Sequence, residues 1–256
     1  MSPGREPAAV IVLRQSPNWG RLTPAYLDET EPIDRALRRP PGFTRSFIEL
    51  WDATFRTTFF EVRKALKDIT LRSFAAVRDA DVVPFTEVGD WPPAPLVLFS
   101  DDDDWFAPDV VEKVASFSRK LGGVTWDSTV LYRGMLVRRS DAYCYTNNYA
   151  VTERVRLPGP WTERVLPHGK AEVTFRRRGF RAGHLPLPLS VANNHPASAQ
   201  QIRVVLDRRP GRDGLIEEVE AFRESAALAG SPAGDLAWAA EPVAAAVELF
   251  GGLALR

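Results

Sequence analysis

Four consecutive aspartates at positions 101–104 form the most distinctive group of reactive side chains in the sequence. They follow the apolar residues 96–99, which have the length and composition of a strand buried on both faces. Open α/β sheets bind their ligands at the carboxyl ends of such strands. Because adjacent negative charges repel one another, the cluster favours a bound cation, and carboxylate oxygens suit magnesium, manganese or calcium. The alternative is a solvated acidic turn that begins the next helix.

The residues around this cluster form a longer motif, which reads Leu96-Val97-Leu98-Phe99-Ser100-Asp101-Asp102-Asp103-Asp104-Trp105-Phe106-Ala107-Pro108-Asp109. The motif resembles the strand, Asp-x-Asp-Asp, Trp, x-x-Pro-Asp signature of the large inverting nucleotide-sugar glycosyltransferase family with the GT-A fold. The resemblance implies an α/β, Rossmann-like fold with a central mixed sheet flanked by helices. It also implies metal-dependent transfer of a hexosyl or deoxyhexosyl group from a nucleotide-diphosphate donor to an acceptor hydroxyl.

The resemblance assigns roles to the individual aspartates. Asp101 and Asp103 are expected to lie beside the sugar-nucleotide and to hold a divalent ion, manganese or magnesium. Asp102 is expected to contribute to donor binding, and Asp104 to belong to the catalytic group. A metal ion held by carboxylates offsets the negative charge that develops on the departing nucleotide diphosphate, so this chemistry needs such side chains.

Inverting transfer also needs a base that removes the proton of the acceptor hydroxyl. Residues 176–181 and 185–189 are similar to an arginine-bearing helix, a Gly-aromatic turn and the next strand of the family. In relatives, a Glu-Asp pair stands shortly before that helix. This sequence lacks the pair, and its nearest acid, Glu172, is the predicted base, with Asp127 and Asp141 as further candidates.

Two more residues follow apolar runs and are candidates for the donor site. His195 comes after the apolar residues 185–191, and its place resembles that of a late histidine that several GT-A enzymes bring to the metal. We therefore predict His195 as a metal ligand, the alternative being an ordinary hydrogen-bonded histidine. Arg14 follows the apolar residues 8–13 and is predicted to contact a donor phosphate, although it could equally pair with an internal acid.

The acceptor is expected to meet aromatic and amide side chains. Residues 143–149 include Tyr145, Asn147 and Asn148, which suit stacking on sugar rings and hydrogen bonding to hydroxyl groups. Trp105, beside the aspartates, is added to this predicted acceptor site. The alternative is that these side chains pack inside the core.

Helical patterns dominate two parts of the chain. Apolar residues recur at spacings of three and four from residue 44 to about residue 78, which predicts an amphipathic helix, broken near residues 68–70. Residues 215–228 and 235–250 predict two further helices, which either cover the sheet or form a homodimer contact. The predicted organisation is a catalytic domain at residues 1–212 and a helical extension at residues 213–256 packed on the same domain.

The overall composition restricts the classes of partner and the cellular compartments that are expected. Lys plus Arg and Asp plus Glu both number 33, so no net positive charge favours nucleic acid. The single cysteine, Cys144, excludes an internal disulfide and fits a reducing cytoplasm. No segment has the length and apolarity of a transmembrane helix or the pattern of a signal peptide, so a cytoplasmic location is expected, with peripheral attachment at the inner membrane face as a variant. The expected partners are a nucleotide-sugar donor and a saccharide, lipid-linked or small-molecule acceptor.

Two rival functions share the acidic cluster. A nucleotidyltransferase would also need a metal and strand-end carboxylates, but it should carry a Gly-rich or basic phosphate loop near the first strand, which the sequence does not display. A catalytically inactive scaffold that binds divalent cations or nucleotide sugars would retain the aspartates and lack the Glu-Asp pair.

Overall fold

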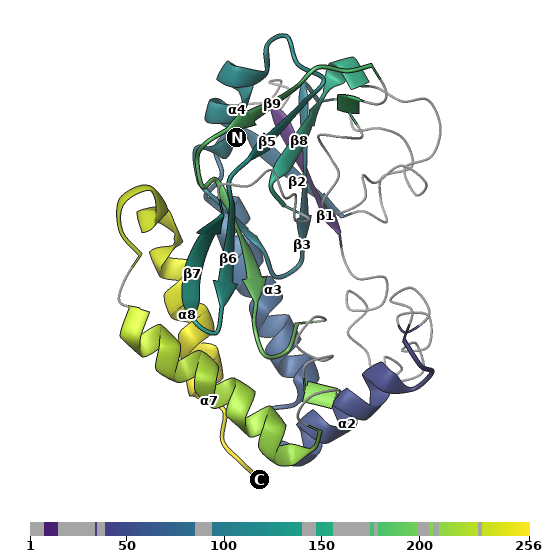
Figure 1. The fold of residues 1–256 in the computed structure, drawn as a ribbon, viewed down its shortest axis with the longest axis vertical. Helices are drawn as coiled ribbons and strands as arrows, with labels where there is room; N and C mark the ends of the chain where they lie inside the picture. The colour runs from purple at the N-terminus through teal and green to yellow at the C-terminus, as the bar shows by residue number, and fades with distance from the viewer. Residues whose placement is uncertain are drawn as a thin grey trace.

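Two β-sheets surrounded by helices make up the described part of the chain (Figure 1). The computed structural model describes residues 8–14, 34, 39–84, 94–139, 147–155, 175–176, 179–198, 205–206, 210–229 and 232–256. Glu172 and Tyr145 lie outside these residues. The larger sheet has six strands in the order β2-β1-β3-β8-β5-β9, and the smaller has four in the order β4-β10-β6-β7.

The larger sheet is mixed. Its strands are β1 (Ala9–Arg14), β2 (Ala80–Pro84), β3 (Leu96–Asp101), β5 (Gly123–Trp126), β8 (Tyr149–Thr152) and β9 (Ala182–Leu185). β1 runs parallel to β2 and β3, β8 is antiparallel to both β3 and β5, and β5 runs parallel to β9. The carboxyl ends of β1, β3, β5 and β9 therefore share one edge. The predicted α/β class, with a central mixed sheet flanked by helices, is confirmed.

Both faces of the larger sheet are covered, which explains why its central strands are uniformly apolar. In β1, Ile11 and Leu13 pack with α4 (Val110–Ser118) on one face, whereas Val10 and Val12 pack on the other face near η3 (Glu153–Val155). Neighbouring residues of β3 alternate between the same two clusters. Asp101 follows Val97 and Phe99 in this alternation, so it belongs to the η3 face.

Three connections lead from the larger sheet into the smaller one. Its strands are β4 (Trp105–Phe106), β6 (Ser128–Tyr132), β7 (Met135–Arg139) and β10 (Ser190–Asn194). The chain leaves the larger sheet at the ends of β3, β5 and β9 and enters the smaller sheet at β4, β6 and β10, respectively. Each of the three connections is short, so the carboxyl edge of the larger sheet is also the junction between the sheets.

The long helix predicted from residue 44 is two helices, and the predicted position of the break is wrong. α2 (Phe43–Thr54) ends where Phe55 adopts extended backbone angles, φ −112° and ψ 153°, and α3 (Phe59–Ala75) runs without a break through residues 68–70. Thr58 explains the position, because its side chain accepts from the backbone N–H of Glu61 while Glu61 accepts from the backbone N–H of Thr58. Asp52 adds a third contact by accepting from the backbone N–H of Phe59.

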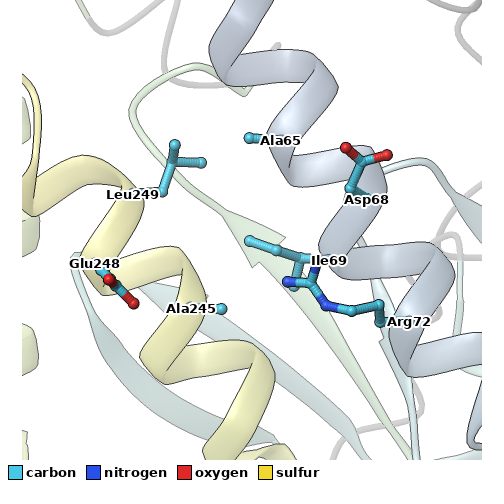
Figure 2. A pocket seen from close by; sticks show the side chains of 7 residues that line it. All are labelled: Ala65, Asp68, Ile69, Arg72, Ala245, Glu248 and Leu249. Atoms are coloured by element: carbon cyan, nitrogen blue, oxygen red, sulfur yellow. The ribbon is translucent and has the colours of Figure 1, made fainter.

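The C-terminal helices join the same core as α2 and α3. α7 (Arg212–Ala229), η5 (Gly234–Ala239) and α8 (Ala240–Gly251) supply apolar side chains to one cluster with α2, α3 and the smaller sheet. A groove of about 350 Å³ lies between α3 and α8, and it carries Asp68 and Arg72 on one wall and Glu248 on the other (Figure 2). None of the described helices is both long enough and apolar enough to cross a membrane.

Candidate functional site

The aspartates lie at the carboxyl end of β3, beside the carboxyl end of β1. The register pairs Arg14 with Asp101 at the last position of the two parallel strands. From β1 the chain first builds β2 on one side and then β3 on the other, which makes this edge a topological switch point. The residues after Asp101 form a turn into β4, and we call Asp101, Asp102, Asp103 and Asp104 the aspartate turn. It stands where α/β sheets bind ligands.

Arg63 of α3 contacts two of these carboxylates. Its Nη2 donates to Asp102 Oδ1 and its Nη1 donates to Asp103 Oδ2, both at 2.6 Å. The exposed fractions of the side chains are 6% for Arg63, 6% for Asp102 and 14% for Asp103. A single guanidinium therefore serves two nearly buried carboxylates, and the ion pairs are shielded from solvent screening.

Arg63 is not among the site residues predicted from the sequence, although its position on the helix indicates a buried charge. Arg63 lies one residue after Val62 and four after Phe59, and all three side chains are buried. A charged residue on the apolar stripe of a helix requires a partner of opposite charge inside the protein. The spacing along α3 predicts that such a partner exists, but only the tertiary structure identifies it.

His195 follows β10 and meets the aspartate turn from the smaller sheet. Its Nε2 lies 3.1 Å from Asp103 Oδ2 and 3.2 Å from Arg63 Nη1. Its Nδ1 accepts a hydrogen bond of 3.1 Å from the backbone N–H of Ala197. Since an accepting Nδ1 places the proton of a neutral imidazole on Nε2, His195 donates to Asp103. The imidazole is fully buried, and this burial lowers its pKa and favours the neutral form.

This tautomer bears on the predicted metal ligands. A histidine that binds a metal through Nε2 must offer a lone pair there, whereas His195 offers a proton. Its Nδ1 is occupied by Ala197. The carboxylates of Asp101 and Asp103 are hard oxygen donors of the kind that manganese and magnesium prefer, whereas the imidazole in this orientation offers no lone pair. Among the described residues, no three or more His, Cys, Asp or Glu side chains are grouped so that they could hold a metal ion. The structure brings His195 to the predicted place and gives it the role of a hydrogen-bond donor, as in the alternative considered above.

The two carboxylates bound by Arg63 have pKa values shifted in opposite directions. Burial raises the pKa of Asp102 to about 6, against the opposing attraction of Arg63. Burial also acts to raise the pKa of Asp103, but the charge of Arg63 and the hydrogen bond from His195 outweigh it and hold this pKa well below its usual range. Asp103 is therefore the carboxylate that stays ionised throughout the neutral and mildly acidic range.

Asp104 faces the smaller sheet. Its Oδ1 accepts a hydrogen bond of 3.0 Å from the backbone N–H of Asn193 in β10, and its side chain is buried. Nearby, Trp105 Nε1 and both polar atoms of the Asn193 side chain are buried and have no hydrogen-bond partner among the residues that the structure describes. Asp104 thus anchors β10 to the aspartate turn.

Three of the predicted acceptor residues, Trp105, Asn147 and Asn148, lie in the interior. Asn147 Nδ2 donates to the backbone carbonyl of Val191 at 2.8 Å, and Asn148 Nδ2 donates to that of Trp126 at 2.9 Å. Both asparagines and Trp105 are almost completely buried. Their placement favours the alternative that these side chains pack and hydrogen bond inside the core.

A second charged cluster lies at the end of β5. Asp127 Oδ2 accepts from Arg138 Nη2 at 2.7 Å and from Nε at 3.0 Å, while Asp127 Oδ1 is 2.8 Å from His184 Nε2. His184 Nδ1 is 3.1 Å from Thr125 Oγ1. Because both oxygens of Asp127 are engaged and the residue is 2% exposed, it lacks the access that a catalytic base requires.

Comparison with known proteins gives distant structural matches. No family model matches the sequence. No curated protein sequence matches it. TarS residues 1–349 from S. aureus, in complex with UDP, aligns over 84% of this chain and 70% of that chain with 9% identity and a TM-score of 0.36. A second crystal structure of TarS residues 1–349 aligns over the same shares of the two chains, with 10% identity and a TM-score of 0.34.

A third match is a glycosyltransferase involved in glycosylation of the major capsid of PBCV-1. It covers 72% of this chain and 93% of that chain, with 14% identity and a TM-score of 0.25. Similarity at this level does not identify a donor, an acceptor or a metal for this chain.

Proposed function

We propose that this protein is a metal-dependent glycosyltransferase that moves a sugar from a nucleotide-diphosphate donor to an acceptor hydroxyl. The observation that carries the proposal is the position of the aspartate turn at the carboxyl end of β3, beside β1 and at the switch point of a mixed α/β sheet. The Asp-x-Asp-Asp-Trp motif stands at this position, and its second carboxylate, Asp103, is kept ionised by its neighbours.

In this proposal Asp101 and Asp103 hold manganese or magnesium against the donor diphosphate. The ion supplies a Lewis acid for the negative charge of the leaving group. His195 fixes the orientation of the Asp103 carboxylate by donating to Oδ2. Arg14, at the end of β1, belongs to the same strand-end edge and is the proposed contact for a donor phosphate.

Two further residues complete the proposed machinery. Asp104 acts by position, because it ties the turn to β10 through the Asn193 backbone. Glu172 is the proposed base for the acceptor hydroxyl. The transferred group is proposed to be hexosyl or deoxyhexosyl, and the acceptor a saccharide, a lipid-linked sugar or a small molecule.

The test is hydrolysis and transfer with UDP-, GDP- and dTDP-sugars in the presence of manganese. The wild-type protein should turn over at least one donor, and Asp103→Asn should reduce this turnover by about a hundredfold or more. Asp127→Asn is the matched control, because Asp127 is also buried and bound by an arginine and a histidine but lies at the end of β5. Equal loss in both variants, or no donor bound by the wild type in a thermal-shift screen, contradicts the proposal.

The same assay separates the rival functions. Donor binding with no turnover, unchanged by Glu172→Gln, would identify an inactive nucleotide-sugar-binding scaffold. Release of pyrophosphate from a nucleoside triphosphate and a sugar phosphate would identify a nucleotidyltransferase.

A further inference from the structure

The guanidinium of Arg63 lies against the carboxylate that the proposed function gives to a metal ion. Arg63 Nη1 is 2.6 Å from Asp103 Oδ2 and 3.2 Å from His195 Nε2, while these last two atoms are 3.1 Å apart. The three atoms form a closed triangle with a positive group at one corner. A cation already occupies one side of the Asp103 carboxylate, and this cation is part of the chain.

We propose that Arg63 is a resident cation that competes with the divalent metal for Asp103, so that the metal binds only when the arginine gives up this carboxylate. The inference rests on the proposed function, because it takes Asp103 as the carboxylate that receives the metal. It goes further by assigning a regulatory role to a side chain on α3, a helix outside the aspartate turn.

Electrostatics sets the two cations in competition at Asp103, where Arg63 holds Oδ2. A divalent ion bound to a carboxylate oxygen at about 2.1 Å would stand close to a guanidinium that contacts the same oxygen. In a nearly buried site, repulsion between these cations is not screened by solvent. The more strongly Arg63 holds Asp103, the weaker the metal binds.

The geometry of Arg63 lowers the free-energy cost of replacing its contact with Asp103 by a metal ion. Arg63 uses Nη1 for Asp103 and Nη2 for Asp102, with both bonds at 2.6 Å. If Nη1 leaves Asp103, Nη2 keeps its partner, and the guanidinium is not left unpaired inside the protein. Asp102 is thus the second carboxylate that lets the arginine move aside, and its proximity distinguishes this arrangement from a simple ion pair.

The arrangement also predicts which charge change matters. Removing Arg63 leaves Asp102 and Asp103 without their guanidinium, and the metal then becomes the cation that neutralises them. Lys64 is the next residue on α3 and its side chain is exposed, so removing its charge alters the net charge equally but not the contacts of the turn. Arg138 provides a second control, because it binds Asp127 in the other cluster.

The experiment measures manganese binding to the full chain without donor, by the free-ion signal in electron paramagnetic resonance and by calorimetry. Arg63→Gln should bind manganese at least tenfold more tightly than the wild type, and manganese should raise its Tm more than that of the wild type. Lys64→Gln and Arg138→Gln should bind manganese like the wild type.

A second substitution tests the inference if Arg63→Gln folds poorly. Arg63→Lys keeps one charge but loses the fork that spans two carboxylates, so its manganese affinity should lie between those of the wild type and Arg63→Gln. If Arg63→Gln is unfolded in buffer, manganese should restore its near-ultraviolet circular dichroism.

Three results would overturn the inference: equal or weaker manganese binding by the Arg63 variants, an equal gain in Lys64→Gln, or no manganese binding by any variant. These results are independent of donor turnover. A protein with tighter manganese binding in Arg63→Gln and no reaction with any nucleotide sugar would retain the arginine–metal competition and lose the proposed function.

Discussion

Two regions of this molecule contain the same three kinds of side chain. At the end of β3, Asp103 is contacted by Arg63 and His195, and at the end of β5, Asp127 is contacted by Arg138 and His184. In the second cluster the arginine and the histidine bind different oxygens of one carboxylate, and both are partly exposed, at 39% and 28%. In the first, both donors converge on one oxygen, and the arginine also serves Asp102.

The difference lies in charge balance. The cluster at β5 has one buried carboxylate for its guanidinium, which also lies 3.6 Å from the exposed Asp235, and it links the two sheets. The cluster at β3 has two nearly buried carboxylates for one guanidinium and is short of positive charge. Buried excess negative charge is unfavourable in a stable core and suits a site that receives a cation.

The largest expected effect is on stability. Without added metal, Arg63→Gln should lower the free energy of unfolding by about 3–5 kcal/mol, because it leaves buried carboxylates uncompensated. Arg138→Gln should cost less, about 1 kcal/mol, because that arginine is partly exposed and the buried Asp127 keeps His184 as a partner. Urea unfolding of the two variants measures the contrast, and equal losses would mean that the clusters do not differ in burial of charge.

The next effect is on turnover. Asp103→Asn should reduce donor turnover by about a hundredfold to a thousandfold, the range seen when one group that stabilises transition-state charge is removed. Asp127→Asn should keep most of the activity, because its carboxylate contacts only protein groups. Steady-state rates with the best donor, measured on variants shown to be folded, decide between the two regions.

A smaller effect concerns pH. Because burial raises the pKa of Asp102 from 3.8 to about 6, the folded state holds this proton more tightly than the unfolded chain. Asp102 therefore lowers wild-type stability as pH rises from about 4 to about 6, after which its contribution is level. Asp102→Asn lacks this titration, so the stability difference in its favour should grow across the same window. Urea unfolding between pH 4 and pH 7.5 tests this, and a constant difference would refute it.

The smallest effect separates the two histidines. His184→Gln removes a hydrogen bond between a partly exposed imidazole and the buried Asp127 and should cost about 1 kcal/mol. His195→Gln should cost more, because its imidazole is fully buried and stacks on Phe250 with ring centroids 5.6 Å apart. Thermal unfolding of both variants provides the comparison, and a larger loss in His184→Gln would reverse the ranking of the clusters.

Individual strands and helices of the fold could be predicted from the sequence. The apolar run before Asp101 predicted the buried strand β3, and the apolar spacing from residue 44 to about residue 78 predicted the helical conformation of α2 and α3. The capping box at Thr58 and Glu61 was also written in the sequence, and it would have placed the helix break correctly. Periodicity alone placed the break elsewhere, because the apolar stripe continues through both helices.

The contacts between segments far apart in the chain could not be predicted from the sequence. Arg63 and Asp103 are 40 residues apart, and His195 is 92 residues from Asp103, so no local pattern links them. The resemblance brought His195 to the correct neighbourhood but could not give its tautomer, which depends on the backbone N–H of Ala197. Asn147 and Asn148 looked like acceptor ligands because composition does not distinguish an exposed amide from one that bonds the main chain of a buried strand.

The aspartate turn is also the segment by which the chain passes from β3 in the larger sheet to β4 in the smaller one. A ligand that binds these carboxylates therefore contacts the junction between the two sheets. Occupancy of the site should consequently slow amide hydrogen exchange in β3 and β10 together, because a ligand there restrains both sheets at once.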